Sequence, residues 1–92
     1  MTTLDSVISR NDDIAWRVIE GEALVVDSRS SLIYPLNGAA TRIWELLDGQ
    51  RNCRDVLAFI DEEFEGNSET HCQDMLEFLE EIVSKGLASR CG

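Results

Sequence analysis

Residues 32–49 read LIYPLNGAATRIWELLDG and mark the point where the chain changes from extended to helical structure. Pro35 ends the extended part, because proline has no N–H for a strand ladder and is found at strand ends or edges. Asn37 is a favourable N-cap residue for the helix that follows. Apolar residues then recur at helical spacing, at Ala40, Ile43, Trp44 and Leu47. The pair Asp48-Gly49 stops the helix, so this stretch predicts a strand followed by one capped, amphipathic helix.

Upstream of this stretch, short apolar runs are separated by turns that contain glycine or serine. Such runs are typical of an antiparallel meander. We predict strands at residues 14–19, 22–27 and 31–35. Residues 1–12 carry no strong pattern and are expected to form a mobile arm.

Downstream, two more helices are predicted. Asn52 is the expected cap of the second helix, with Asp55 three residues on as a variant of the capping box. A break at residues 65–67 precedes the third helix, for which Ser68 is the expected cap, and Lys85-Gly86 closes it. The apolar stripe of the third helix is Cys72, Met75, Leu76, Leu79, Ile82 and Val83.

The order of these elements predicts an α+β fold: a three-stranded antiparallel sheet followed by three helices (β-β-β-α-α-α). Two short helices and a longer one after a small sheet also match a winged helix-turn-helix arrangement. A chain of 92 residues has room for one hydrophobic core, so residues 1–92 are expected to form a single domain.

The charge is strongly negative, with 8 Lys and Arg against 18 Asp and Glu, a net charge of −10. Such a surface repels the phosphates of nucleic acid and anionic lipids, and it favours a basic partner or simply keeps the protein in solution. No apolar run reaches the ~18–20 residues of a membrane span, and no signal pattern begins the chain. We therefore expect a cytoplasmic protein. The widely spaced Cys53, Cys72 and Cys91 suit reduced thiols.

Chemistry-bearing residues are few. His71 and Cys72 are adjacent, and neighbours on a helix point about 100° apart, so they do not form a catalytic dyad. The set Cys53, His71, Cys72 and Cys91 does not match the spacing of structural zinc sites. The sequence therefore predicts no enzyme activity, no metal and no cofactor.

Two features suit the binding of another chain. The strand at Leu32–Pro35 would accept an added strand if it lies at the edge of the sheet; otherwise it is a core strand whose outer edge is solvated. Phe78 lies outside the core stripe of the third helix, aligned with Asp74, Glu81 and Lys85, although it could also just widen the buried face. Together the two features predict a groove for an extended peptide.

The sequence also resembles a known family. Its segment Leu36-Asn37, Ala40, Ile43-Trp44, Leu46-Leu47 and Asp48-Gly49 is similar to the "LN…A…IW.LLDG" signature of PqqD-like proteins. The ending Asp74-Met75, Phe78-Leu79, Ile82 and Lys85-Gly86-Leu87 resembles the last helix of that family, and residues 21–27 resemble its second strand. The resemblance covers about residues 14–88.

This resemblance implies a non-enzymatic peptide-recognition element. Members bind the leader of a ribosomally made precursor peptide and present it to a modifying enzyme, often a radical S-adenosylmethionine protein, or to a leader protease and cyclase. The leader adds as a strand beside the third strand and packs on the third helix. The peptide-binding residues implied here are Ser31, Leu32, Ile33, Tyr34, Pro35, Asp74, Phe78 and Glu81.

The sequence departs from PqqD itself, which serves pyrroloquinoline quinone (PQQ) synthesis. Tyr34-Pro35 directly precedes Leu36-Asn37, without the longer segment of PqqD, and Gly86 is followed by leucine rather than tryptophan. We therefore favour a PqqD-like relative, a monomer or homodimer that serves a PQQ-type, lasso-peptide or other peptide pathway. The alternatives are a winged-helix DNA-binding protein, which the acidic third helix disfavours, and a general protein–protein interaction module.

Overall fold

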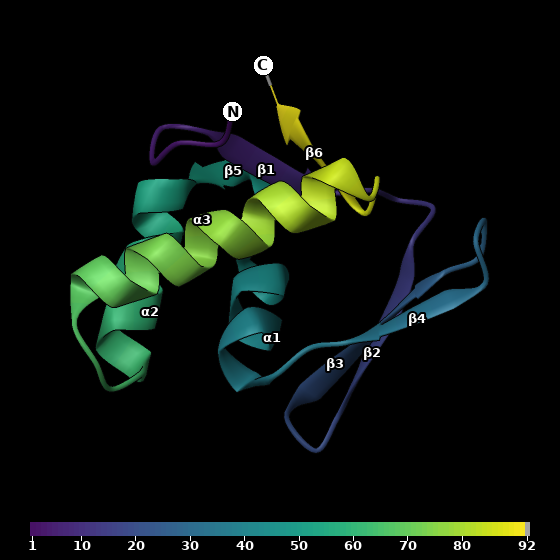
Figure 1. Ribbon diagram of the computed structural model, residues 1–92, viewed down its shortest axis with the longest axis horizontal. Helices are drawn as coiled ribbons and strands as arrows, with labels where there is room; N and C mark the ends of the chain where they lie inside the picture. Colours follow the sequence, from purple (N-terminus) through teal and green to yellow (C-terminus); the bar gives the residue numbers. More distant parts are fainter. Residues whose placement is uncertain (92) are drawn as a thin grey trace.

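The structure, a computed structural model, describes residues 1–91 and contains over them two three-stranded antiparallel sheets and three helices (Figure 1). The strands are β1 (Val7–Arg10), β2 (Ala15–Ile19), β3 (Glu22–Asp27), β4 (Leu32–Pro35), β5 (Asp48–Asn52) and β6 (Ala88–Cys91). The helices are α1 (Gly38–Leu46), α2 (Cys53–Glu63) and α3 (Ser68–Ser84). The predicted α+β class is confirmed, and β2, β3 and β4 precede the three helices as predicted. The predicted order is nevertheless incomplete, because β1 precedes this sheet, β5 lies between α1 and α2, and β6 follows α3. The winged-helix label stays a prediction.

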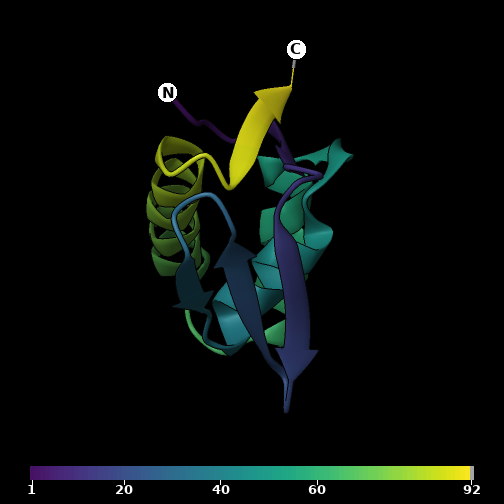
Figure 2. The ribbon, with the colours of Figure 1, turned by 90° about the vertical axis from the view of Figure 1, so that its right-hand side faces the viewer.

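The sheet β2-β3-β4 forms where the sequence predicts it. Its first hairpin turns at Glu20 (φ 52°) and Gly21 (φ 81°), the left-handed pair of a two-residue turn. Val25 lies opposite both Trp16 and Tyr34 and is 1% exposed, so this row of residues faces the core. All three helices lie on that side of the sheet, and Figure 2 looks onto its other side.

A second sheet, β5-β1-β6, is absent from the sequence prediction. Its central strand β1 lies at residues 7–10, inside the segment expected to be a mobile arm, and Ile8 in it is 1% exposed. The strand pairs with residues 48–52 and 88–91, far away in the chain. Short, mostly polar strands stabilised by such distant partners leave no alternating pattern in a local window.

The helix caps are mostly those predicted. Asn37 Oδ1 accepts the N–H of Ala40 at 2.9 Å, and Asn52 Oδ1 accepts that of Asp55 at 2.9 Å. The third cap was predicted one residue too late. Asn67 caps α3, and the hydroxyl of Ser68 instead donates to Asp61 at 2.5 Å. The core is then built from the inner face of the β2-β3-β4 sheet and the apolar stripes of the helices, around Trp44, which is 0% exposed.

Candidate functional site

Strand β4 lies at the edge of its sheet. Within the described residues it pairs with β3 on one side, and no strand pairs with its other side. Beyond its end, the N–H of Leu36 donates to the carbonyl of Ala23 on β3 at 2.8 Å. In an antiparallel pair, successive residues direct their backbone groups alternately toward and away from the partner strand. Tyr34 therefore bonds to β3, whereas the N–H and C=O of Ile33 and the C=O of Pro35 point outward. The outer edge of β4 can thus pair with a further strand.

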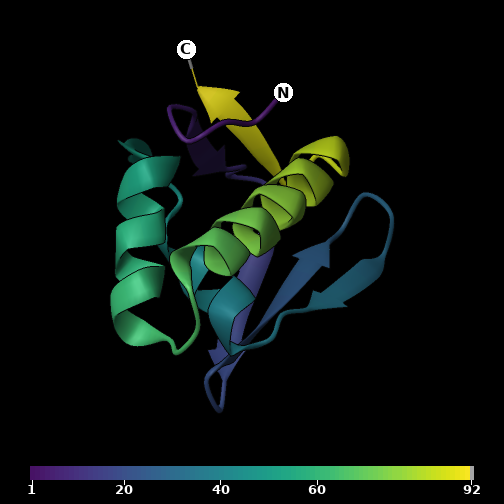
Figure 3. The same cartoon turned by 60° about the vertical axis from the view of Figure 1, so that its left-hand side comes forward.

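Helix α3 runs from α2 toward the β3–β4 hairpin (Figure 3). A groove lies between this helix and β4. Its first part, about 230 Å³, holds Tyr34, Pro35, Phe78 and Glu81 at its walls. Its second part, about 350 Å³, adds Asp74 and shares Phe78 and Glu81 with the first. The structure thus brings five of the eight residues predicted for the site around one groove, with Phe78 between its two parts.

The other three predicted residues lie outside the lining of the groove. Ser31 is in the hairpin turn, with a φ of 59°. Leu32 and Ile33 are 51% and 60% exposed. Since side chains alternate along a strand, Ile33 lies on the face of the sheet opposite to Tyr34.

The groove has an apolar floor and an acidic rim. Ala40 and Trp44 of α1 contribute to the floor beneath Phe78. Glu77 joins Asp74 and Glu81 on the rim formed by α3. Such a site suits an extended chain with apolar side chains and a basic residue that faces α3.

Lys85 is one of the lining residues that the prediction from sequence does not include. Its Nζ lies 4.8 Å from the centre of the Tyr34 ring and 2.6 Å from Glu81 Oε1, which raises the pKa of Lys85. Lys85 thereby connects α3 to β4 at one end of the groove. Helical spacing predicts that Lys85 and Phe78 share one face of α3. No local sequence pattern predicts that Tyr34 lies beneath Lys85.

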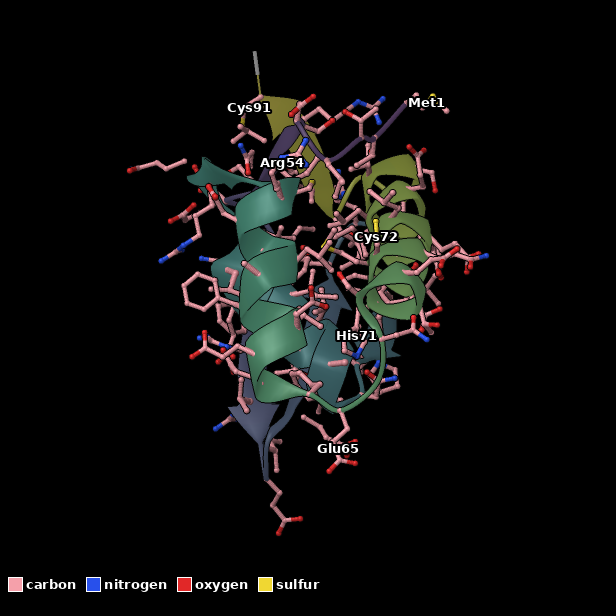
Figure 4. All side chains as sticks on the ribbon, turned by 90° about the vertical axis from the view of Figure 1, so that its left-hand side faces the viewer. Met1, Arg54, Glu65, His71, Cys72 and Cys91 are labelled. Atoms are coloured by element: carbon pink, nitrogen blue, oxygen red, sulfur yellow. The ribbon has the colours of Figure 1, made fainter. Side chains whose placement is uncertain are left out.

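His71 lies in the first turn of α3, and its side chain is mostly buried. Its side chain is 11% exposed and lies between α2 and α3 above the loop that carries Glu65 (Figure 4). Nδ1 is 2.8 Å from Asp61 Oδ1, and Nε2 is 2.9 Å from the carbonyl of Glu65. Both neighbours are acceptors, and only the protonated ring can donate to both. The hydrogen bond with Asp61 and that with Glu65 raise the pKa of His71, and the imidazole serves to join two helices.

We expect the pKa of His71 to lie above its usual 6.5 and to make the stability pH-dependent. A raised pKa stabilises the fold fully below pH 6.5, and this stabilisation is lost as the pH rises through the pKa of the folded state. Asp61, whose pKa is lowered mainly by Ser68 and then by His71, acts oppositely: its stabilisation is present above pH 3.8 and is lost as the pH falls through its folded-state pKa. Asp74 adds its charge to the surroundings of His71.

The measurement is the NMR titration of the single imidazole, together with urea unfolding from pH 6 to 9. The wild type should lose its stability advantage over His71→Gln across this range, and Asp61→Asn should return the pKa of His71 toward 6.5. An unshifted titration in the wild type would contradict the two-acceptor geometry.

The three thiols lie in different environments. Cys53 is 1% exposed, and burial raises its pKa to about 11; Cys72 is partly buried and Cys91 is exposed. Within residues 1–91, no cluster of three His, Cys, Asp or Glu side chains has the arrangement of a metal site. None of the helices described has the length and apolar character needed to cross a membrane.

The fold and the groove define a class: a small α+β protein whose open sheet edge borders an apolar cleft under a helix. The comparison with family models agrees with this class, because the model described as coenzyme PQQ synthesis protein D (PqqD) matches residues 22–88. The chain belongs to the PqqD family. The resemblance noted in the sequence is thereby confirmed.

Two solved structures have the same fold. A chain described as TbiB1 in complex with the TbiA(beta) leader peptide aligns with a TM-score of 0.78 at 21% identity, over 87% of this chain and 93% of that one. A lasso peptide synthetase B1 complexed with its leader peptide aligns with a TM-score of 0.77 at 21% identity, over 89% of this chain and 96% of that one. A comparison with curated proteins finds no match.

Proposed function

We propose that this chain is a non-enzymatic adaptor that binds the leader of a ribosomally made precursor peptide as an added strand on β4. The observation that carries the proposal is the outward-facing N–H and C=O of Ile33, next to a groove lined by Phe78. Main-chain pairing would give affinity and register, and pockets for alternate side chains would give specificity. Membership of the PqqD family and the fold shared with two leader-bound proteins support this role.

In this function the adaptor presents the leader to a modifying enzyme. That enzyme would be a radical S-adenosylmethionine protein, or a leader protease and cyclase, in a PQQ-type or peptide natural-product pathway of the cytoplasm. Tyr34 and Phe78 would contact apolar leader side chains, while Asp74 and Glu81 attract basic ones. No cofactor takes part, because the adaptor itself performs no chemical step.

The test is a calorimetric titration with synthetic leader segments of candidate precursor peptides, chosen from short open reading frames near the gene for this chain. Phe78→Ala should weaken binding about 30-fold, the effect of losing an interface anchor worth roughly 2 kcal/mol. Phe59→Ala is the matched control, since Phe59 is also partly buried but lies on α2 among Arg42 and Arg51, away from the groove. Its affinity should stay within about twofold of the wild type. Equal losses in both variants would refute the groove as the leader site.

A further inference from the structure

The outer face of the β2-β3-β4 sheet is apolar where a solvated face is normally polar. Side chains alternate along a strand, so the neighbours of the buried Val25 point away from the helices. The paired register places the following residues on this outer face: Ala15, Arg17, Ile19, Glu22, Leu24, Val26, Ile33 and Pro35. We call this set the outer patch. Six of these eight residues are apolar.

The outer patch is open over the described part of the chain. Ile19 is 48% exposed and Ile33 is 60% exposed, and Leu24 and Val26 at its centre are only partly buried. The helices lie behind the sheet (Figure 2). An antiparallel sheet with one solvated face ordinarily alternates apolar and polar residues, and β3 does not. A contiguous apolar patch of this kind marks a protein-binding surface.

We propose that the outer patch docks the enzyme that acts on the bound precursor, through an apolar surface rimmed by basic residues. This inference rests on the proposed function and names the surface that would carry the presentation step. The apolar surface of the enzyme would match the apolar side chains of the outer patch. The basic rim matches the exposed Glu20 and Glu22 at the first hairpin, which outnumber Arg17, the one basic residue of the outer patch.

The patch is continuous with the proposed leader site through β4. That strand offers its outer backbone edge to the leader and the side chain of Ile33 to the outer patch, and Pro35, which the register places on the same face as Ile33, also lines the groove. A leader paired with β4 would place every second side chain beside these two residues, on the same face. The sheet would then grow from three strands to four, and the enzyme would contact adaptor and leader together. Docking is therefore expected to be stronger when the leader is bound.

The experiment measures the affinity of this chain for a purified candidate modifying enzyme, chosen from the genes near its own, with and without the leader peptide. In the double variant Leu24→Thr, Val26→Thr, threonine keeps the strand preference and removes the apolar surface. Enzyme binding should weaken at least tenfold while leader binding stays within twofold. Ile19→Lys, at an exposed position, repeats the test should the double variant fold poorly. Val18→Thr is the control, because Val18 is 41% exposed but belongs to the opposite face of β2.

The outcomes separate this inference from the proposed function. Loss of enzyme binding with leader binding retained supports the outer patch as the docking surface. Enzyme binding that survives both patch variants overturns it. A wild-type chain that does not bind the leader overturns the proposed function instead. Sedimentation velocity tests whether the outer patch instead binds a second copy of this chain. A dimer of the chain alone that dissociates in the patch variants would assign the patch to that second copy and overturn the inference.

Discussion

Replacing Ile33 with proline is expected to abolish leader binding while the chain stays folded. The N–H of Ile33 points away from β3, so no internal hydrogen bond is lost. The added strand, in contrast, loses a donor, and the proline ring occupies the place where that strand must lie. Leaving a leader carbonyl buried without a partner costs about 1–3 kcal/mol. With the steric block, we expect affinity to fall at least 100-fold, as measured by calorimetry.

Two control variants make this result specific. Ile33→Ala keeps the N–H and should retain leader binding within a few-fold, since the side chain lies on the other face of the sheet. Leu32→Pro removes a donor that points toward β3, because Leu32 shares the orientation of Tyr34; it should lower the free energy of unfolding. If Ile33→Pro binds the leader as the wild type does, strand addition at β4 is excluded.

The sequence predicts the fold well wherever the pattern is local. The hairpin turn at Glu20-Gly21 and the caps Asn37 and Asn52 lie where composition and spacing put them. The second sheet is not predicted from the sequence, because its strand β1 pairs with residues about 40 and 80 positions away in the chain. Gly49 illustrates the ambiguity. The sequence predicts Gly49 only as a helix stop, yet in the structure it lies in β5, with a φ of 79° and a close approach to Ser9.

The candidate site was predictable in part. Helical spacing sets Phe78 apart from the core stripe, and Pro35 indicates a strand end or edge. The groove itself forms because α3 lies against β4, an arrangement that places Lys85 over Tyr34. The raised pKa of His71 is also a tertiary effect, since Asp61 lies on another helix. Spacing within one element predicts which face a residue occupies, but not what lies opposite that face.

Trp44 joins the fold to the groove. It is 0% exposed, packs edge-on against Trp16 with ring centres 6.2 Å apart, and contributes to the groove floor. Among buried side-chain nitrogen and oxygen atoms of residues 1–91, its Nε1 has no hydrogen-bond partner. An unpaired buried donor costs about 1–3 kcal/mol, so Trp44 stabilises the fold through its volume rather than through its N–H.

Trp44→Ala is therefore expected to lower the free energy of unfolding by about 3–5 kcal/mol, through the cavity it leaves and the lost aromatic contact. The free energy of unfolding of a 92-residue chain is roughly 5–14 kcal/mol in total, so this substitution removes a large part of the stability. Trp44→Phe should lower the free energy of unfolding by less than half of this amount. Phenylalanine leaves a smaller cavity than alanine, and the substitution also removes the unpaired N–H. Urea unfolding followed by far-UV circular dichroism measures both values. Equal losses would mean that Nε1 has a partner, such as an ordered water, and that the indole N–H itself stabilises the core beneath the groove.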